Sequence, residues 1–144
     1  YARQCYTKAV DMARKPVFYD QYRVADTIDG RFDMIALGVF LQAQKEPEDA
    51  LKLAMTEQMI ADMDQGLREM GVGDMGVGKR VEKMAFALNG RLQGYAQAWG
   101  DDAAMQDALW RNLYRSDADK REVAAELLSY LREHYAKDGQ SQEA

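Results

Sequence analysis

Apolar side chains recur every three or four residues along nearly the whole chain, which is the spacing of one face of an α-helix. The clearest run is Val77, Val81, Met84, Leu88, Leu92, Tyr95 and Trp99. Weaker runs predict helices over residues 5–13, from about 26, from about 47 to 70, from 102 to about 114, and from about 119 to 135. No segment has the strict alternation of a half-buried β-strand. The pattern predicts an all-α fold, a single compact domain of about six helices over residues 1–136, with a polar C-terminal tail over residues 137–144.

The helix predicted from about residue 26 has the most apolar sequence. Asp26 to Gly30 has the composition of a helix start, with Asp29 and Asp33 near the positive end of the helix dipole. One face then repeats apolar residues at helical spacing: Ile28, Phe32, Ile35 and Val39. From residue 34 to 41 the helix is apolar nearly all round. Such a helix must lie at the centre of the core or be covered by a partner.

Four glycines, Gly71, Gly73, Gly76 and Gly78, fall within eight residues between two long predicted helices. They match two phosphate-binding patterns, GxGxxG and, with Lys79, GxxxxGK. Both patterns need a strand before the glycines, whereas a helix precedes them here, and Arg80 replaces the Ser or Thr that holds magnesium. The stretch therefore favours a rigid corner in which Gly71 ends a helix in the left-handed conformation.

The charge distribution limits the partners. The net charge of −5 argues against broad nucleic-acid binding, which needs a net basic face. Residues 1–24 nevertheless carry five Lys or Arg against two Asp, and Lys79, Arg80 and Lys83 form a second basic cluster. A solvated helix face is the default interpretation of these clusters, and local contact with an acidic partner or a membrane surface stays open. No stretch approaches the roughly 18 consecutive apolar residues of a membrane-spanning helix, so membrane contact is peripheral at most.

Catalytic and metal-binding constellations are scarce. His134 is the only histidine and Cys5 the only cysteine, so zinc and di-iron sites that need several such ligands cannot be built. Asp62 and Glu69 would share one helix face, and Asp64 can pair with Arg68 one turn later. Solvated helix charges explain these acids better than acid–base catalysis does. We expect no metal and no cofactor.

Six of the nine methionines lie between residues 55 and 84, around the glycine stretch. Methionine is flexible and polarizable, so it adapts to varied apolar segments at binding surfaces, and it also fills irregular cores. Core filling is the favoured explanation. A surface apolar groove rimmed by polar groups is the alternative.

Several short motifs occur in a fixed order along the chain: Phe18-Tyr19, VADTIDGRFD at 24–33, DMD at 62–64, LREMGVGD at 67–74, VGKR at 77–80, and Gly90-Arg91 with Tyr95. Together they resemble the ubiquinol-cytochrome c chaperone family, over most of the chain from about Phe18 to Tyr114. One departure is visible. Leu37-Gly38 stands where the resemblance leads us to expect Leu-His.

The resemblance implies a non-enzymatic assembly chaperone that binds newly made cytochrome b and supports biogenesis of the ubiquinol-cytochrome c reductase (bc) complex. It also implies a small co-chaperone and the ribosomal exit region as partners, and a place in the cytoplasm, peripherally at the inner membrane, or in the mitochondrial matrix of a eukaryote. The residues expected to contact partners or brace the corner are Asp26, Arg31, Asp62, Asp64, Arg68, Glu69, Asp74, Lys79, Arg80 and Arg91.

Two other functions stay open on the sequence alone. One is an anion- or nucleotide-binding enzyme that uses the glycine-rich turn of residues 71–79. The other is a helical adaptor unrelated to respiration.

Overall fold

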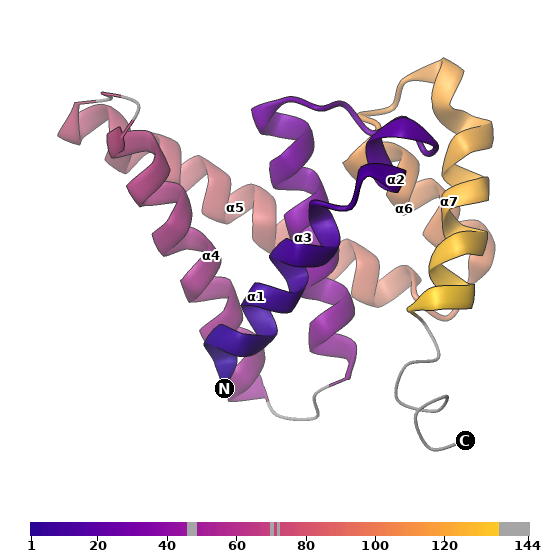
Figure 1. Ribbon diagram of the computed structural model, residues 1–144, viewed down its shortest axis with the longest axis horizontal. Coiled ribbons are helices and arrows are strands. Elements are labelled where there is room, and N and C mark those ends of the chain that lie inside the picture. Colours follow the sequence, from indigo (N-terminus) through magenta and orange to yellow (C-terminus); the bar gives the residue numbers. More distant parts are fainter. Residues whose placement is uncertain (46–48, 70, 72, 136–144) are drawn as a thin grey trace.

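The computed structural model describes residues 1–45, 49–69, 71 and 73–135. In these residues the chain forms seven α-helices and one 3₁₀ turn, with no strand (Figure 1). In chain order they are α1 (Ala2–Ala13), α2 (Pro16–Asp20), α3 (Ile28–Gln44), α4 (Asp49–Glu69), α5 (Asp74–Ala98), α6 (Asp102–Leu113), η1 (Ala118–Lys120) and α7 (Arg121–His134). The all-α prediction is confirmed. The additional helix is α2, whose five residues are too few to show periodicity.

The starts of the helices follow their capping residues. Thr27 precedes α3, and its Oγ1 accepts a hydrogen bond from the backbone N–H of Gly30 at 3.0 Å. Asp101 caps α6 by accepting from the backbone N–H of Ala103 at 3.0 Å. Pro16 occupies the first turn of α2, where its missing N–H costs nothing. Pro47 and Met70, the predicted limits of the next long helix, lie outside the described residues, as does the tail after residue 135.

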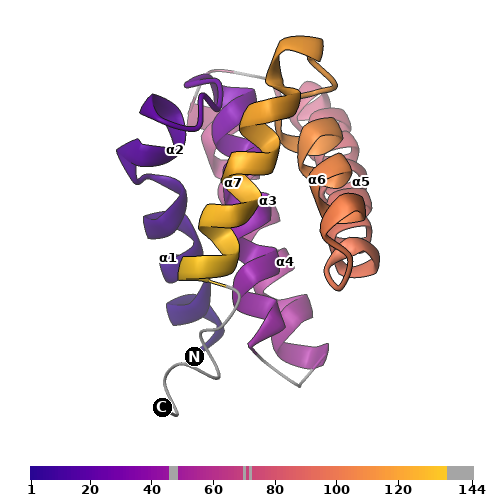
Figure 2. The same ribbon diagram turned by 90° about the vertical axis from the view of Figure 1, so that its right-hand side faces the viewer.

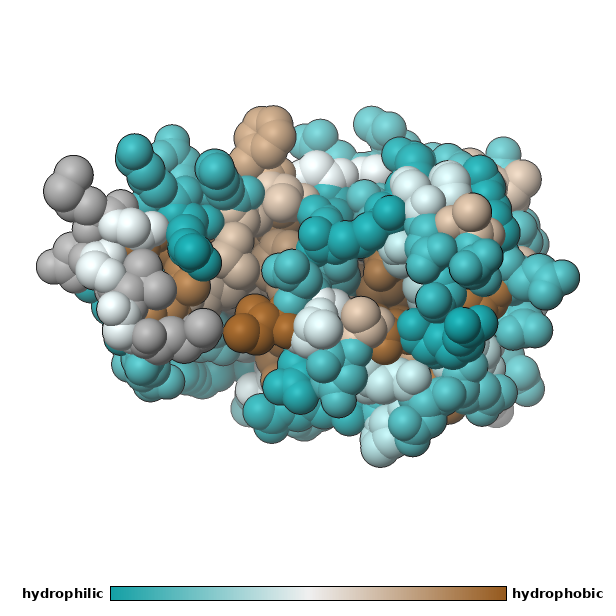
Figure 3. All heavy atoms as spheres, turned by 90° about the horizontal axis from the view of Figure 1, so that it is seen from above, coloured by the Kyte–Doolittle hydropathy of each residue, from teal (hydrophilic) through white to brown (hydrophobic). Residues whose placement is uncertain are grey.

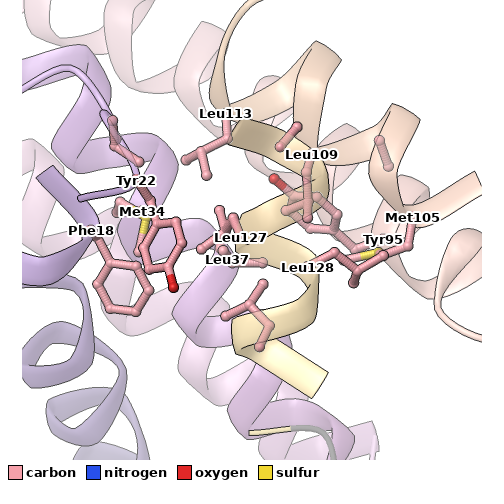
Figure 4. Packing of buried hydrophobic residues seen from close by; sticks show 14 of the residues in the cluster. Phe18, Tyr22, Met34, Leu37, Tyr95, Met105, Leu109, Leu113, Leu127 and Leu128 are labelled. Carbon is pink, nitrogen blue, oxygen red and sulfur yellow. The ribbon is translucent and has the colours of Figure 1, made fainter. Parts of the chain in front are cut away.

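Helix α3 runs through the middle of the molecule, with the other α-helices arranged around it (Figures 1 and 2). On one side it shares a core with α2, the C-terminal part of α5, α6 and α7, and Met34 and Leu37 belong to the same buried cluster as Leu109 and Leu127 (Figure 4). On the other side it shares a second core with α1, α4 and α5, which includes Phe32, Ala36 and Val39 of α3 and Met55 and Met59 of α4. The central position predicted for this helix is confirmed. Ile28 is the exception, because it is 61% exposed.

Helices α1 and α3 cross with almost no space between their backbones. A Cβ atom built on Gly38 would lie 2.7 Å from the carbonyl oxygen of Ala9 in α1, closer than real Cβ contacts allow. Gly38 is the position where the sequence resemblance suggests histidine. The glycine therefore allows the close α1–α3 contact, and an imidazole could not occupy this position unless α1 moved.

The α1–α3 crossing gives a first prediction. Replacement of Gly38 by Ala should lower the free energy of unfolding by about 1–3 kcal/mol, the usual cost of forcing atoms into a packed interface. Replacement of Gly90 by Ala is the matched control, since a Cβ there meets nothing within 4 Å. Because alanine is the better helix former, Gly90→Ala should raise stability by up to about 1 kcal/mol. Urea denaturation of both variants measures the difference, and equal effects would contradict the crossing.

Two buried tyrosines differ in how their hydroxyl groups are satisfied. Tyr114 donates a hydrogen bond of 2.6 Å to the backbone carbonyl of Tyr22. This bond holds the end of α6 against the segment that follows α2. No described residue offers a hydrogen-bond partner to the Tyr95 hydroxyl, although Tyr95 is fully buried. Burial raises the pKa of both phenols above the usual value. Both side chains are therefore buried, but only the Tyr114 hydroxyl has a hydrogen-bond partner among the described residues.

This difference gives a second prediction. Tyr95→Phe should leave stability unchanged or raise it by about 1 kcal/mol, because it removes a buried polar group without a protein partner. Tyr114→Phe should lower stability by about 1 kcal/mol, because it leaves the Tyr22 carbonyl without its donor. Thermal and urea unfolding of the two variants side by side give the measurement. A larger loss for Tyr95→Phe than for Tyr114→Phe would contradict the assignment.

Candidate functional site

A groove of about 710 Å³ lies where α1, α2 and the N-terminal half of α3 meet α4 and α5. Its floor is apolar and is formed by residues of four helices: Val10, Phe32, Ile35, Met59, Met63, Leu67 and Met84. Figure 3 views the molecule from above and shows brown apolar atoms between teal polar ones, in the region between the α4–α5 hairpin and the rest of the fold. Three of the clustered methionines thus line a surface groove.

The rim of the groove carries charges of both signs. Asp26 and Arg31 form an exposed ion pair at 2.9 Å across the start of α3. Burial raises the pKa of the Tyr6 phenol, and the neighbouring carboxylate of Asp62 in α4 raises it further. Arg14 and Asp20 also line the groove. An apolar floor with a mixed polar rim can bind one face of a helix and keep its polar flanks in water.

The partner-contact residues expected from the sequence do not form one site. Asp26, Arg31 and Asp62 lie at the groove. Asp64 and Arg68 pair with each other along α4 at 3.2 Å, and Gln65 donates to Glu69 at 3.1 Å, so these charges follow the helix surface.

The remaining predicted charges lie on or within α5. Lys79 and Arg80 are exposed in its second turn, and Lys79 lines a separate shallow hollow with Glu82, Lys83 and Phe86. Asp74 begins the helix, and the placement of its side chain lies outside what the structure describes.

Arg91 points into the protein, where it meets Asp33, a carboxylate only 1% exposed. Arg91 Nη2 lies 3.1 Å from Asp33 Oδ1. On the other side Arg115 donates twice, from Nε to Oδ2 at 3.0 Å and from Nη2 to Oδ1 at 3.1 Å. This cluster, the Asp33 cluster, joins α3, α5 and the loop after α6. Arg91 is thus placed to brace the fold rather than to meet a partner.

The electrostatics of the Asp33 cluster follow from its burial. Burial raises the pKa of the Asp33 carboxyl, and the hydrogen bonds from Arg115 and the charge of Arg91 offset part of that rise. The same pairing raises the pKa of the Arg115 guanidinium. Arg115 and the following Ser116 have φ angles of 53° and 61°, a left-handed conformation that costs side chains energy. The loop is therefore held in a strained form that presents Arg115 to Asp33.

The cluster also reaches the groove. The guanidinium of Arg91 lies 5.5 Å from the centre of the Phe32 ring, and Phe32 is part of the groove floor. Phe32 and Asp33 are consecutive in α3, so one points to the groove and the other to the interior. The sequence alone places Asp33 only near a helix start. The sequence does contain one sign of its burial, because this acid directly precedes the apolar run of residues 34–41.

The glycine corner is shorter than the sequence predicts. Gly71, after the end of α4, has the predicted left-handed conformation with φ 84°, and Gly73 precedes α5 as its N-cap. Gly76 and Gly78 lie inside α5, so their assignment to the turn is wrong. At Gly78 a Cβ atom would meet nothing within 4 Å, so the available space does not require glycine at this position. Both phosphate-binding patterns require a strand before the glycines, and here the helix α4 precedes them.

The described residues hold neither a cluster of metal-binding side chains nor a helix suited to crossing a membrane. No three His, Cys, Asp or Glu side chains in the described part of the chain gather as a metal site. None of the helices over these residues is long and apolar enough to span a bilayer.

The Asp33 cluster gives a third prediction. Asp33→Ala should lower the free energy of unfolding by about 3–5 kcal/mol, because it leaves Arg91 in the interior without its counter-charge. Asp107→Ala is the control, since Asp107 pairs with Arg111 at 2.8 Å on the exposed side of α6. Such surface pairs contribute at most about 1 kcal/mol. Urea denaturation compares the two, and a similar small loss for both would mean that the cluster does not hold the fold.

The family model described as ubiquinol-cytochrome C chaperone matches residues 20–137. Among solved structures, the crystal structure of the Cbp3 homolog from Brucella abortus is similar, with a TM-score of 0.75 and 33% sequence identity over 90% of this chain and 75% of that chain. A comparison with curated proteins found no match.

Proposed function

Because the chain belongs to the ubiquinol-cytochrome C chaperone family, we propose that it is a non-enzymatic chaperone that binds newly made cytochrome b during assembly of the bc complex. The observation that carries the proposal is the apolar groove between α1–α3 and the α4–α5 hairpin. Cytochrome b is a membrane protein, and its helices expose apolar surface before they are packed. A chaperone for it must cover such a surface reversibly.

The chemistry of the groove suits this client. Met63 and Met84 are half-buried, so their side chains remain reachable from solvent at the floor. Methionine side chains adapt to differently shaped apolar helices at low energetic cost, which favours binding of successive segments of one client. The mixed charges of the rim stay hydrated beside the bound helix and oppose burial of the rim itself.

We extend the proposal to the partners that the family suggests. A small co-chaperone and the exit region of the ribosome would bring the chaperone to its client as synthesis proceeds. The net charge of −5 makes a broad contact with ribosomal RNA unfavourable, so docking at the ribosome would use a protein surface or a local basic segment. Such a role places the protein beside the membrane that receives cytochrome b, in the cytoplasm or the mitochondrial matrix.

The groove gives a fourth prediction. Met63→Glu places an unpaired carboxylate in the apolar floor and should reduce capture of newly made cytochrome b by about tenfold or more, since burying such a charge is costly. Leu53→Glu is the matched control, because Leu53 lies on the same helix, is 60% exposed and is outside the groove. It should leave capture unchanged.

The measurement is the amount of newly made cytochrome b recovered from cells with each variant, together with the amount of assembled bc complex. Thermal unfolding confirms that both variants are folded. Normal capture by folded Met63→Glu would reject the groove as the client site. Normal accumulation of cytochrome b in cells lacking the protein would reject the function itself.

A further inference from the structure

Phe86 is the most exposed of the large apolar side chains in the described part of the chain, at 83%. It projects from α5 on a face that also carries Lys79 and Lys83, with which it lines a shallow hollow. The three residues follow a spacing of i, i+4 and i+7, so they share one stripe of the helix. We define the α5 basic face by Lys79, Lys83, Phe86 and, one turn further, Gly90.

The charges on this face are available. Neither lysine has an ion-pair partner among the described residues. Glu82 is the single acid that lines the hollow. Beyond Phe86 the stripe continues with Gly90, where a Cβ would meet nothing within 4 Å, so the helix surface there is smooth and open. The α5 basic face therefore combines one projecting aromatic ring with unpaired cations, on a chain whose net charge is −5.

This combination fits a bilayer better than a folded protein. A stable protein interface buries about 800 Å² on each side around a substantial apolar centre, whereas the apolar centre here is one ring. A bilayer interface needs no preformed pocket, because a phenyl ring enters the boundary between headgroups and acyl chains while lysine stems extend their ammonium groups to phosphates. Anionic lipid attracts each nearby cation and repels the acidic remainder of the chain, which orients the protein.

We propose that the α5 basic face is a peripheral membrane-binding surface for anionic phospholipid, with Phe86 as the inserting side chain and Lys79 and Lys83 as phosphate contacts. The proposal is independent of the client groove. Met84 faces that groove, and Phe86, two residues later, faces away from it. One helix thus carries the two surfaces on different sides.

Co-sedimentation of the full chain with vesicles tests the proposal. The wild type should bind phosphatidylcholine vesicles that contain about 30% phosphatidylglycerol, should bind pure phosphatidylcholine vesicles much more weakly, and should lose affinity as salt rises from about 0.05 M to about 0.5 M. Lys79→Gln with Lys83→Gln should lower affinity about 25-fold, since each cation contributes about fivefold. The matched charge control, Arg3→Gln with Lys8→Gln on α1, should have a much smaller effect.

Substitution at Phe86 separates insertion from charge. Phe86→Ala should lower affinity about tenfold, and Phe86→Trp should retain it, because tryptophan also enters the bilayer interface. Equal binding to neutral and anionic vesicles, or an equal loss in the α1 control, would overturn the proposal. So would photo-crosslinking from residue 83 in cells that recovers a protein in place of lipid.

The groove variant distinguishes this proposal from the chaperone function. Met63→Glu should bind anionic vesicles normally, and the Lys79→Gln, Lys83→Gln variant should still capture cytochrome b segments in detergent solution. Loss of vesicle binding by Met63→Glu would overturn the independence of the two surfaces. Absence of wild-type vesicle binding, with capture intact, would remove the membrane surface and leave the chaperone function standing.

Discussion

The Asp33 cluster is the interaction on which the arrangement of the helices depends. A carboxylate that is 1% exposed cannot stay charged in an apolar interior without close counter-charges. Arg91 and Arg115 supply these charges from α5 and from the loop after α6, so three distant parts of the chain are held at one point. The left-handed backbone at Arg115 is strained, and the double hydrogen bond to Asp33 offsets that strain.

The same cluster also determines the shape of the groove, because Asp33 is next to the groove residue Phe32 in α3. Phe32 and Asp33 are neighbours, and Arg91 contacts both, the ring by a cation–π contact and the carboxylate by an ion pair. Since Arg91 belongs to α5, it fixes that helix relative to the groove floor. The far end of the α4–α5 hairpin extends past the core, as Figure 1 shows, and residues of both helices line the open groove. The open groove is thus a consequence of where the hairpin is anchored.

Periodicity was sufficient to predict most of the helices. A helix that buries one face has apolar residues every three or four positions, and this spacing can be seen within the segment itself. The helix start around Thr27 and the left-handed Gly71 were also predictable, since caps depend on a few adjacent residues. The pairing of Asp33 with Arg115 was not, because the partners lie 82 residues apart and neither has a local signature. Arg91 was expected to contact partners or to brace the corner, and its pairing with Asp33 was missed for the same reason.

The glycines and methionines show where local patterns mislead. Gly76 and Gly78 were read as turn residues, yet helix formation continues through them because Val77 between them is fully buried, and the packing of that side chain outweighs the low helix propensity of glycine.

Some of the methionines are buried in the core and others line the groove, a difference that composition cannot reveal. Met55 is fully buried in the core around α1, whereas Met63 and Met84 are half-buried and line the groove. Both explanations of the methionine-rich region, core filling and an adaptable surface, therefore hold for different residues. A helix pair with its apolar side only partly covered is less stable than a closed core, and this incomplete coverage is what an apolar client requires of a surface that must bind it and later release it.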